Sequence, residues 1–316
     1  MLRSSLSMDE VVWIDGRVHS REEARISAFD HGFLYGDSIY ETIRTSHGRP
    51  FLLDRHLNRL RRSAALMELT LDRDDTSYRD AIQTALAAVH HTESAIRVVV
   101  TRGVGDFGYG RDLCRKPTTL VYVRPMTPIR GPERRDGVQV SIVDIRRNDS
   151  STVSPAAKTS NLLNNILGSF QAQNSGATEG IMLNRDGDVA EGTMSNLFIV
   201  RAGKVLTASL DVGILPGITR QFVLDLAEDD GLIMQETRFR PDQLVAADEA
   251  FLTGTTKGIL PITGVDGHVI GDGKPGAVTQ HLIHLFDETE DRLMARTADD
   301  DAAATKRPSP SGENRR

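Results

Sequence analysis

The feature that most constrains the fold is a segment rich in proline, glycine and arginine near the middle of the chain, RPMTPIRGPERRDG. Such a composition interrupts regular secondary structure and is typical of linkers between domains. The length of 316 residues is sufficient for two domains of ordinary size. We therefore expect a small N-terminal domain over residues 9–124, a linker over 125–136 and a larger domain over 137–297.

Both sides of this linker carry strand-like and helix-like segments. Short runs of β-branched and apolar residues predict strands in SIYETIRT, AIRVVVTRG, TTLVYVRPM, VQVSIVDI and DEAFLTGTT, and hairpins in VVWIDGRVHS, GIMLNRDGDVAEGT and NLFIVRAGKVLTA. Apolar residues three and four apart predict helices in RPFLLDRHLNRLRRSAALMEL, SYRDAIQTALAAVHH, LPGITRQFVLDLAEDDG and AVTQHLIHLFDETEDRL. This mixture predicts an α+β fold. Residues 27–36 are expected to form a loop, and the polar residues 298–316 a disordered tail.

Composition excludes several functional classes. A net charge of −6 argues against nucleic acid as the main partner. The chain has no run of about 18 apolar residues, so we expect no membrane span, and its first residues lack the apolar core of a secretory signal. Cys114 is the only cysteine, which precludes an internal disulfide and favours a reducing compartment, the cytoplasm.

Lysine is scarce, and one lysine has an unusual setting. Only six of the 38 basic residues are lysine. Lysine forms imines with aldehydes, whereas arginine does not. Lys158, in SPAAKTSNLLNNIL, lies between a proline-containing loop and a helix that we expect to end near Gly176. Its uncharged neighbours favour desolvation, which lowers the pKa of an amine and makes it nucleophilic. Lys158 is the candidate for a Schiff base.

Two further charged residues allow a functional interpretation. Glu191, in VAEGTMSN, is either a solvated acid at the end of a strand or a carboxylate held against a heteroaromatic nitrogen, as pyridoxal phosphate requires. Arg59, in HLNRL, is either a solvated helix residue or a bidentate phosphate ligand.

Two loops contain residues that could bind a phosphate group. GILPGITR places Gly217, Ile218 and Thr219 at a helix start, where free N–H groups and the helix dipole favour an anion. An ordinary helix start explains the same residues. The loop from Thr253 to Thr256 offers hydroxyl groups for a second contact, although such loops are common.

Other motifs do not support alternative chemistries. GVGDFG at residues 103–108 matches a dinucleotide-binding pattern, but it leads into a loop and not a helix, so we expect a substrate-facing loop. The histidines, among them His31, His56, His281 and His284, lack the spacing of a metal site, and we predict none. Neither Ser63 nor Ser195 has a His/Asp pattern that indicates a hydrolase.

Taken together, the segments DHGFLYGDSIYETIR, HLNRLRRSA, TRGVGDFGYG, KTSNLLNNIL, EGTMSNLF, LPGITR and DEAFLTGTT resemble the fold-type IV pyridoxal-phosphate enzymes, the class IV aminotransferases. The resemblance covers residues 11–286. It implies the class IV fold, in which pyridoxal 5'-phosphate lies between a small N-terminal and a larger C-terminal domain. It also implies a homodimer in which the DHGFLYGD loop completes the partner's pocket.

The resemblance also implies a role for each matched residue. Lys158 would form the Schiff base and move the substrate proton, and Glu191 would pair with the pyridine nitrogen. The phosphate would be held by Arg59, Ile218, Thr219 and Thr255. The substrate pocket would be lined by Tyr35, Tyr40, Arg97 and Thr256.

The subfamily is less sharply indicated. DHGFLYGD, RGVGDFG and NNIL are similar to branched-chain amino-acid aminotransferases, but Leu163 and Ala95 stand where those enzymes usually have tyrosine. Leu163 is similar to D-amino-acid aminotransferases, and EGTMSNLF and GILPGITRQFVL resemble 4-amino-4-deoxychorismate lyases. We predict an aminotransferase with ping-pong kinetics that uses a branched-chain or similar apolar amino acid and 2-oxoglutarate, whose distal carboxylate would pair with Arg97. The alternatives are the lyase, the D-amino-acid enzyme and a non-catalytic binding protein.

Overall fold

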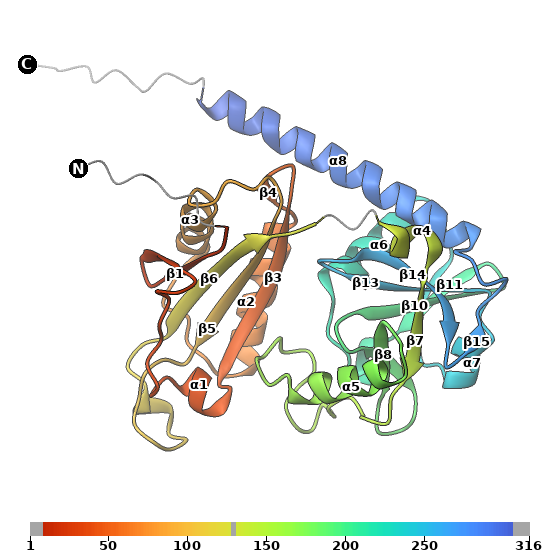
Figure 1. Cartoon of the computed structure of the whole chain (residues 1–316), viewed down its shortest axis with the longest axis horizontal. Helices are drawn as coiled ribbons and strands as arrows, with labels where there is room; N and C mark the ends of the chain where they lie inside the picture. Colours follow the sequence, from red (N-terminus) through yellow and green to blue (C-terminus); the bar gives the residue numbers. More distant parts are fainter. Residues whose placement is uncertain (1–8, 128–130, 306–316) are drawn as a thin grey trace, which may run out of the picture.

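The N-terminal half is built on one antiparallel sheet. The computed structural model describes residues 9–127 and 131–305. The sheet has six strands in the order β2-β1-β6-β5-β3-β4 (Figure 1). Their bounds are β1 Val11–Ile14, β2 Arg17–Ser20, β3 Ser38–Ser46, β4 Arg49–Pro50, β5 Ser94–Thr101 and β6 Thr118–Pro125. The predicted first hairpin is confirmed, with its turn at Asp15 and Gly16, both at positive φ.

Helices cover one face of this sheet. The helices of this half are α1 His31–Tyr35, α2 Leu53–Leu66, α3 Asp75–Leu86 and the short 3-10 helix Arg111–Leu113. Alternate residues of the strands, such as Ile43, Val98 and Val121, pack against Leu60 of α2 and Ile82 of α3, and all five are fully buried. The other face of the sheet is therefore left to face the C-terminal half.

The C-terminal half contains a second, mixed sheet of nine strands. The order is β12-β11-β10-β13-β14-β7-β8-β9, and β15 pairs with β14. The neighbours β11–β12, β14–β7 and β7–β8 are parallel, and the remaining pairs are antiparallel. The bounds are β7 Val138–Ile142, β8 Glu179–Leu183, β9 Val189–Gly192, β10 Asn196–Arg201, β11 Lys204–Ala208, β12 Met234–Thr237, β13 Glu249–Gly254, β14 Gly258–Val265 and β15 His268–Val269.

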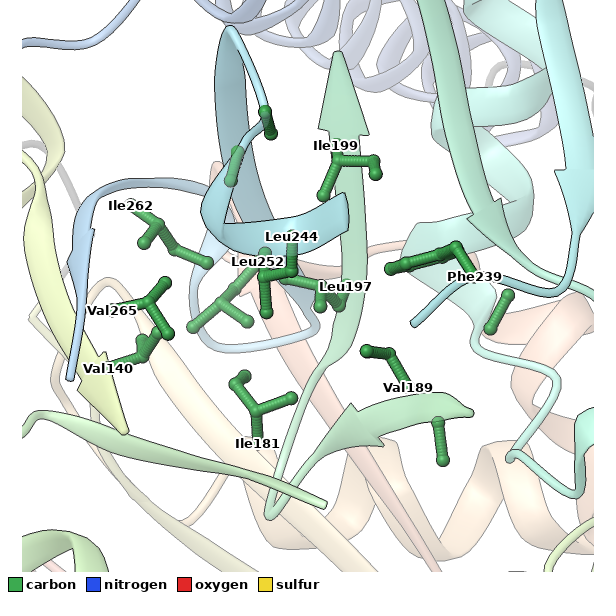
Figure 2. Packing of buried hydrophobic residues seen from close by; sticks show 14 of the residues in the cluster. Val140, Ile181, Val189, Leu197, Ile199, Phe239, Leu244, Leu252, Ile262 and Val265 are labelled. Atoms are coloured by element: carbon green, nitrogen blue, oxygen red, sulfur yellow. The ribbon is translucent and has the colours of Figure 1, made fainter. Parts of the chain in front are cut away.

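One hydrophobic core of this half lies between the strands and the short helix α7, and a second includes residues of α6 and α8. Val140, Ile181, Leu197, Leu252 and their neighbours form one apolar cluster contributed by many strands (Figure 2). The helices of this half are α4 Pro132–Asp136, α5 Leu163–Asn174, α6 Ile218–Asp229, α7 Pro241–Val245, α8 Ala277–Thr305 and the 3-10 helix Leu210–Val212.

The long helix α8 connects the two halves. It runs along the top of both of them in Figure 1. Glu290 of α8 accepts two hydrogen bonds, at 2.6 and 2.5 Å, from Arg44 of β3. The ring of Phe286 on α8 lies edge-on to Phe51, which follows β4. This helix therefore fastens the end of the first sheet to the second half of the chain.

The structure corrects the expectations for three segments: residues 27–36, the linker and the tail. Residues 27–36 contain α1, which begins because the Asp30 carboxylate accepts the Gly32 N–H at 2.8 Å and ends at Gly36, where φ is 68°. The expected linker contains α4, with Pro132 in the first turn, while residues 128–130 lie outside the described residues. The third difference concerns the tail.

The expectation of disorder from residue 298 is wrong for residues 298–305, because α8 continues to Thr305. Alanine has the highest helix propensity, and extending an existing helix needs no new nucleus, so the residues 302–304, all alanine, prolong it. Residues 306–316 lie outside the described part of the chain. Within the described ranges, no helix combines the length and apolar character needed to cross a membrane.

Candidate active site

A cavity of about 480 Å³ lies between the two halves of the chain. This volume is in the range of pockets for small molecules and cofactors. Its wall on one side is the uncovered face of the first sheet, represented by Tyr40, Arg97 and Arg124. On the other side the wall is formed by the loop that contains Lys158, by the turn after β9, by the start of α6 and by the loop between β13 and β14.

Lys158 is held in this cavity by pairing with the first sheet. Its carbonyl accepts the Tyr40 N–H at 2.9 Å, and its own N–H is donated to the Ser63 hydroxyl of α2 at 3.0 Å. Helix α5 begins only at Leu163, because the backbone after Lys158 hydrogen-bonds to the edge of β3, through Ser160 and Ser38, instead of turning into a helix. Lys158 is therefore a loop residue whose backbone is fixed by hydrogen bonds to the N-terminal half of the chain.

The amine of Lys158 has a phenol as its nearest polar partner. Its Nζ lies 3.4 Å from the Tyr40 hydroxyl and 4.4 Å from the centre of the Tyr40 ring. The guanidinium of Arg97 lies over the same ring at 3.9 Å. Tyr40 thus orients both cations, and no acidic side chain in the described ranges pairs with the amine.

Glu191 is buried at the end of β9, and its carboxylate accepts three hydrogen bonds. One oxygen accepts a hydrogen bond from Arg147 Nε at 2.6 Å, and the other accepts from Asn196 Nδ2 at 3.1 Å and from the Leu215 N–H at 3.0 Å. Burial raises the pKa of Glu191, and Arg147 partly opposes this rise. A cationic partner inside the cavity would lower that pKa and favour the charged carboxylate.

Arg59 belongs to a buried network that sequence reasoning missed. Its guanidinium donates two hydrogen bonds to Glu41, at 2.7 and 2.8 Å, and one to the Pro216 carbonyl at 3.2 Å. Burial alone would raise the pKa of Glu41, but Arg59, together with His56, outweighs this effect and holds the value at about 2. Arg59 is therefore presented to the cavity by a permanently charged carboxylate.

His56 completes this network as a neutral ring. Burial lowers its pKa, although the adjacent Glu41 opposes that change. Its Nδ1 lies 2.7 Å from Glu41, and because a carboxylate only accepts hydrogen bonds, that nitrogen must carry the proton. The two partners together satisfy the Glu41 carboxylate and restrict the position of Arg59.

The start of α6 presents free backbone N–H groups to the cavity. Gly217 is the N-cap residue, and no side chain caps this helix. Gly217, Ile218 and Thr219 all line the cavity. The first N–H groups of a helix lack intrahelical partners and lie at the positive end of its dipole. With Arg59 beside them, they form a site suited to a phosphate.

A Cβ at Gly217 would lie 2.0 Å from Oδ1 of Asn196, so only glycine fits there without displacing its neighbour. Asn196 in turn donates to Glu191. A side chain at residue 217, at the start of α6, would therefore displace the residue that donates a hydrogen bond to Glu191.

The loop between β13 and β14 supplies hydroxyl groups and a second lysine. Thr255 and Thr256 both line the cavity. Lys257 also lines it, but its Nζ is bound to the buried carboxylate of Glu179 and lies 3.2 Å from the Ser195 hydroxyl. Because Glu179 neutralises it, Lys257 differs from Lys158, which has no acidic partner in the described ranges.

Most of the residues predicted for the site are brought together here, and one is not. Tyr35 lies on α1, outside the residues that line the cavity; its hydroxyl accepts the Gly108 N–H at 3.2 Å, and its ring contacts His31 and Tyr109. The other predicted residues that line the cavity are Tyr40, Arg59, Arg97, Lys158, Glu191, Ile218, Thr219, Thr255 and Thr256.

The residues that reasoning from sequence missed are Glu41, Arg147, Lys257 and Glu179. For Glu41 a signal existed, because it stands between Ile39 and Ile43 on the inward face of a strand. An acid at such a position requires a buried partner. The other three have no comparable signal, since their partners are distant in the sequence. In the described ranges, no group of three or more His, Cys, Asp or Glu side chains could hold a metal ion.

Pyridoxal phosphate fits these groups by their chemistry: a lysine without an acidic partner, a buried carboxylate, and a phosphate site made by Arg59 and a helix start. When bound, it supplies an electron sink for the negative charge left on a substrate carbon after proton removal. The residues present would hold its phosphate and its ring nitrogen and place the Lys158 amine beside the reacting carbon.

Comparison with known proteins identifies the family of the chain. The family model of class IV amino-transferases matches residues 38–265. A putative branched-chain-amino-acid aminotransferase of Methanocaldococcus jannaschii is 35% identical over 92% of this chain and 99% of its own length. An aminodeoxychorismate lyase of Bacillus subtilis is 33% identical over 87% of this chain and 93% of its own length. A D-alanine aminotransferase of Bacillus licheniformis is 33% identical over 86% of this chain and 94% of its own length.

A solved branched-chain aminotransferase from the thermophilic archaeon Thermoproteus uzoniensis, with norvaline, superimposes with a TM-score of 0.82 at 31% identity, over 90% of this chain and 95% of that one. Together these matches show the family: the chain belongs to the class IV aminotransferases, which are pyridoxal-phosphate-dependent enzymes. The predicted family, fold and cofactor class are confirmed.

Proposed function

We propose that this protein moves an amino group between a branched-chain or similar apolar amino acid and 2-oxoglutarate, in two half-reactions at one cavity. The observation that carries this proposal is the convergence of Lys158, Glu191 and the Arg59–Glu41 pair on that cavity. Lys158 would remove and return the substrate proton, Glu191 would keep the ring nitrogen protonated, and Arg59 with Ile218, Thr219 and Thr255 would bind the phosphate.

The residues that line the cavity are complementary to two kinds of substrate, one aliphatic and one with a second carboxylate. Apolar side chains line part of it, among them Val153, Leu162, Ile166, Phe170 and Met194. They suit an aliphatic amino acid. Arg97, beside Tyr40, suits the distal carboxylate of 2-oxoglutarate. Two half-reactions at one site predict ping-pong kinetics.

Exposed apolar side chains support a homodimer as the working form. Phe33 on α1 is 67% exposed, Phe107 is 72% exposed, and Leu163 on α5 is 68% exposed. Large apolar patches on a surface mark association sites. In such a dimer Tyr35 would approach the partner's pocket. We also propose that residues 9–124 and 137–297 are separate domains, and that the enzyme works in the cytoplasm, as its single cysteine suggests.

The alternative functions are distinguished by the form of the cofactor that remains after reaction with an amino donor. Ala95 and Leu163 supply no phenol near the cavity, unlike the tyrosines expected in branched-chain enzymes, and this favours a lyase or a D-amino-acid enzyme as the second candidate. A transaminase accumulates pyridoxamine phosphate when it is given an amino donor alone, whereas a lyase returns pyridoxal phosphate.

The first experiment is therefore the absorption spectrum of the holoenzyme before and after additions of L-leucine, D-alanine and L-glutamate. Conversion to pyridoxamine phosphate with L-leucine and L-glutamate is the expected result. Conversion with D-alanine alone would replace the proposed donor by a D-amino acid. No conversion with any of the three would move the assignment to the lyase, and aminodeoxychorismate would then be the substrate to test.

The role of Lys158 has its own test, because the cavity contains a second lysine. Borohydride reduction followed by peptide mapping should place the trapped cofactor on Lys158 and not on Lys257, whose amine is bound to Glu179. Lys158→Ala should abolish turnover and trapping, while Lys257→Ala should retain trapping. Cofactor found on Lys257 in the wild type would contradict the assignment.

A further inference from the structure

Two arginines project into the cavity from adjacent strands of the first sheet. Arg97 on β5 lies opposite Tyr122 of β6, and Ala95 lies opposite Arg124, so the two arginines are diagonal neighbours on one face. Diagonal pairs in antiparallel sheets have Cα atoms about 7–8 Å apart, within reach of each other's long side chains. Both residues line the cavity.

These two arginines resemble Lys158, and differ from the other cations that line the cavity, by having no acidic partner in the described ranges. Among the described lining residues, Arg59 is paired with Glu41, Arg147 with Glu191 and Lys257 with Glu179. Arg97 instead contacts the Tyr40 ring. Neither Arg97 nor Arg124 makes an ion pair with any residue in the described ranges.

The neighbouring arginine on the same face shows how this sheet otherwise neutralises such a charge. Arg44 lies in the row of Ala95 and Arg124, and it is held by Glu290 of α8 through two hydrogen bonds. Among the described lining residues, Glu191 is the only acid, and Arg147 already binds it. The positive charge of Arg97 and Arg124 is therefore left for a ligand.

We propose that Arg124 is a specificity-determining residue that forms, with Arg97, a subsite for the side-chain carboxylate of a dicarboxylic amino acid or keto acid. Two guanidinium groups offer separate donors to the two carboxylate oxygens. Ala95, opposite Arg124, has no side chain beyond Cβ and leaves room beside it. The subsite deepens the proposed function and rests on it, since it identifies where the acidic partner of the reaction is recognised.

This arrangement confines the role of Arg124 to one half-reaction. An aliphatic substrate has no charge for it to bind, and burial of an apolar side chain depends on the apolar part of the wall. Removal of Arg124 should therefore change the binding of dicarboxylates and leave aliphatic substrates nearly unaffected.

The test compares Arg124→Ala, Arg124→Lys and the control Arg17→Ala in the holoenzyme. Arg17 is an exposed arginine of β2, on the same sheet but outside the residues that line the cavity. We expect Arg124→Ala to raise the dissociation constant for glutarate and the Michaelis constant for 2-oxoglutarate by about tenfold or more, the usual effect of losing a hydrogen bond to a charged group. The Michaelis constant for 4-methyl-2-oxopentanoate should stay within about twofold.

Arg124→Lys should fall between the wild type and Arg124→Ala, because lysine keeps the charge but loses the planar fork. An unchanged dissociation constant for glutarate in Arg124→Ala, with Arg17→Ala equal to it, would overturn the subsite. Glutarate binding, followed by titration calorimetry, requires no turnover. A wild type that binds glutarate through Arg124 but transaminates none of the substrates would thus refute the proposed function and leave the subsite standing.

Discussion

At the scale of single residues, Glu41 fixes the position of the Arg59 guanidinium, which is the proposed phosphate ligand. It is fully buried on β3, between Ile39 and Ile43, and both of its oxygens accept hydrogen bonds from Arg59 or His56. A buried carboxylate without these partners would take up a proton. Because the partners are present, Glu41 stays charged and keeps the Arg59 guanidinium turned toward the start of α6.

Glu41 makes stability depend on pH in a defined window. Its pKa is lowered from 4.5 to about 2 in the folded chain. A carboxylate with a lowered folded-state pKa stabilises the fold above the unfolded-state value, and this contribution is lost as the pH falls from 4.5 toward 2. The loss should amount to about 3 kcal/mol. Urea unfolding at a series of pH values between about 7 and 2 measures this loss.

The variant to test is Glu41→Gln, and its matched control is Glu10→Gln. The control removes an exposed acid that is paired with Arg21. Glu41→Gln should lower the free energy of unfolding at neutral pH by about 3–5 kcal/mol, because Arg59 loses its counter-charge, and should flatten the pH dependence below about pH 5. Glu10→Gln should change the free energy by less than about 1 kcal/mol. A Glu41→Gln protein with the pH dependence of the wild type would show that Glu41 is not the titrating group.

At the scale of elements, the start of α6 couples the two ends of the cofactor site. A Cβ added at Gly217 would lie against Asn196, which donates to Glu191 and to the Leu215 carbonyl. A side chain at residue 217 therefore cannot be accommodated by moving Asn196 alone, since that movement breaks two hydrogen bonds.

Gly217→Ala should consequently weaken the affinity for pyridoxal phosphate by about tenfold or more and destabilise the apoprotein by about 1–3 kcal/mol, as overpacking does. Gly131→Ala is the matched control, because Gly131 is also an uncapped helix N-cap, with no atom within 4 Å of an added Cβ. Equilibrium dialysis against pyridoxal phosphate and thermal unfolding of both variants give the two quantities. Equal affinities would mean that the start of α6 tolerates a side chain and that the phosphate is bound elsewhere.

At the scale of the whole molecule, the two halves make one site because several hydrogen bonds and ion pairs cross between them. The backbone of Lys158 pairs with β3, Arg59 reaches the Pro216 carbonyl, and α8 binds Arg44. The cavity walls come from both halves, so any relative movement of the halves changes the shape of the cavity.

The proposed homodimer belongs to this scale as well. Light scattering should give twice the chain mass of 34.7 kDa. Phe33→Asp places a charge in the exposed apolar surface of α1 and should shift the protein to monomer and reduce turnover. Ile233→Asp is the control, since Ile233 is 60% exposed but precedes β12 in the C-terminal half. A Phe33→Asp protein that remained dimeric and fully active would remove α1 from the interface.

Local sequence patterns were sufficient to predict many of the strands, helices and candidate site residues. The elements that they did not predict have a physical explanation. The predicted strands and hairpins were recovered because alternation and turn residues act over a few positions, and Lys158, Glu191, Arg59 and the start of α6 could be named because their motifs are contiguous. Strand β14 was not predicted, since Pro261 and Gly264 obscure its pattern.

Only the tertiary structure determined which charged side chains form ion pairs. Glu41 and Arg59 are separated by 18 positions, Arg147 and Glu191 by 44, and Glu179 and Lys257 by 78. The order of strands sets these pairs, and no local pattern encodes it. The sequence by itself determined most of the elements, the family and the candidate lysine, because these depend on short segments. The fold decided which cations are neutralised and which, like Arg97 and Arg124, remain for a substrate, because neutralisation depends on the spatial contact of distant strands.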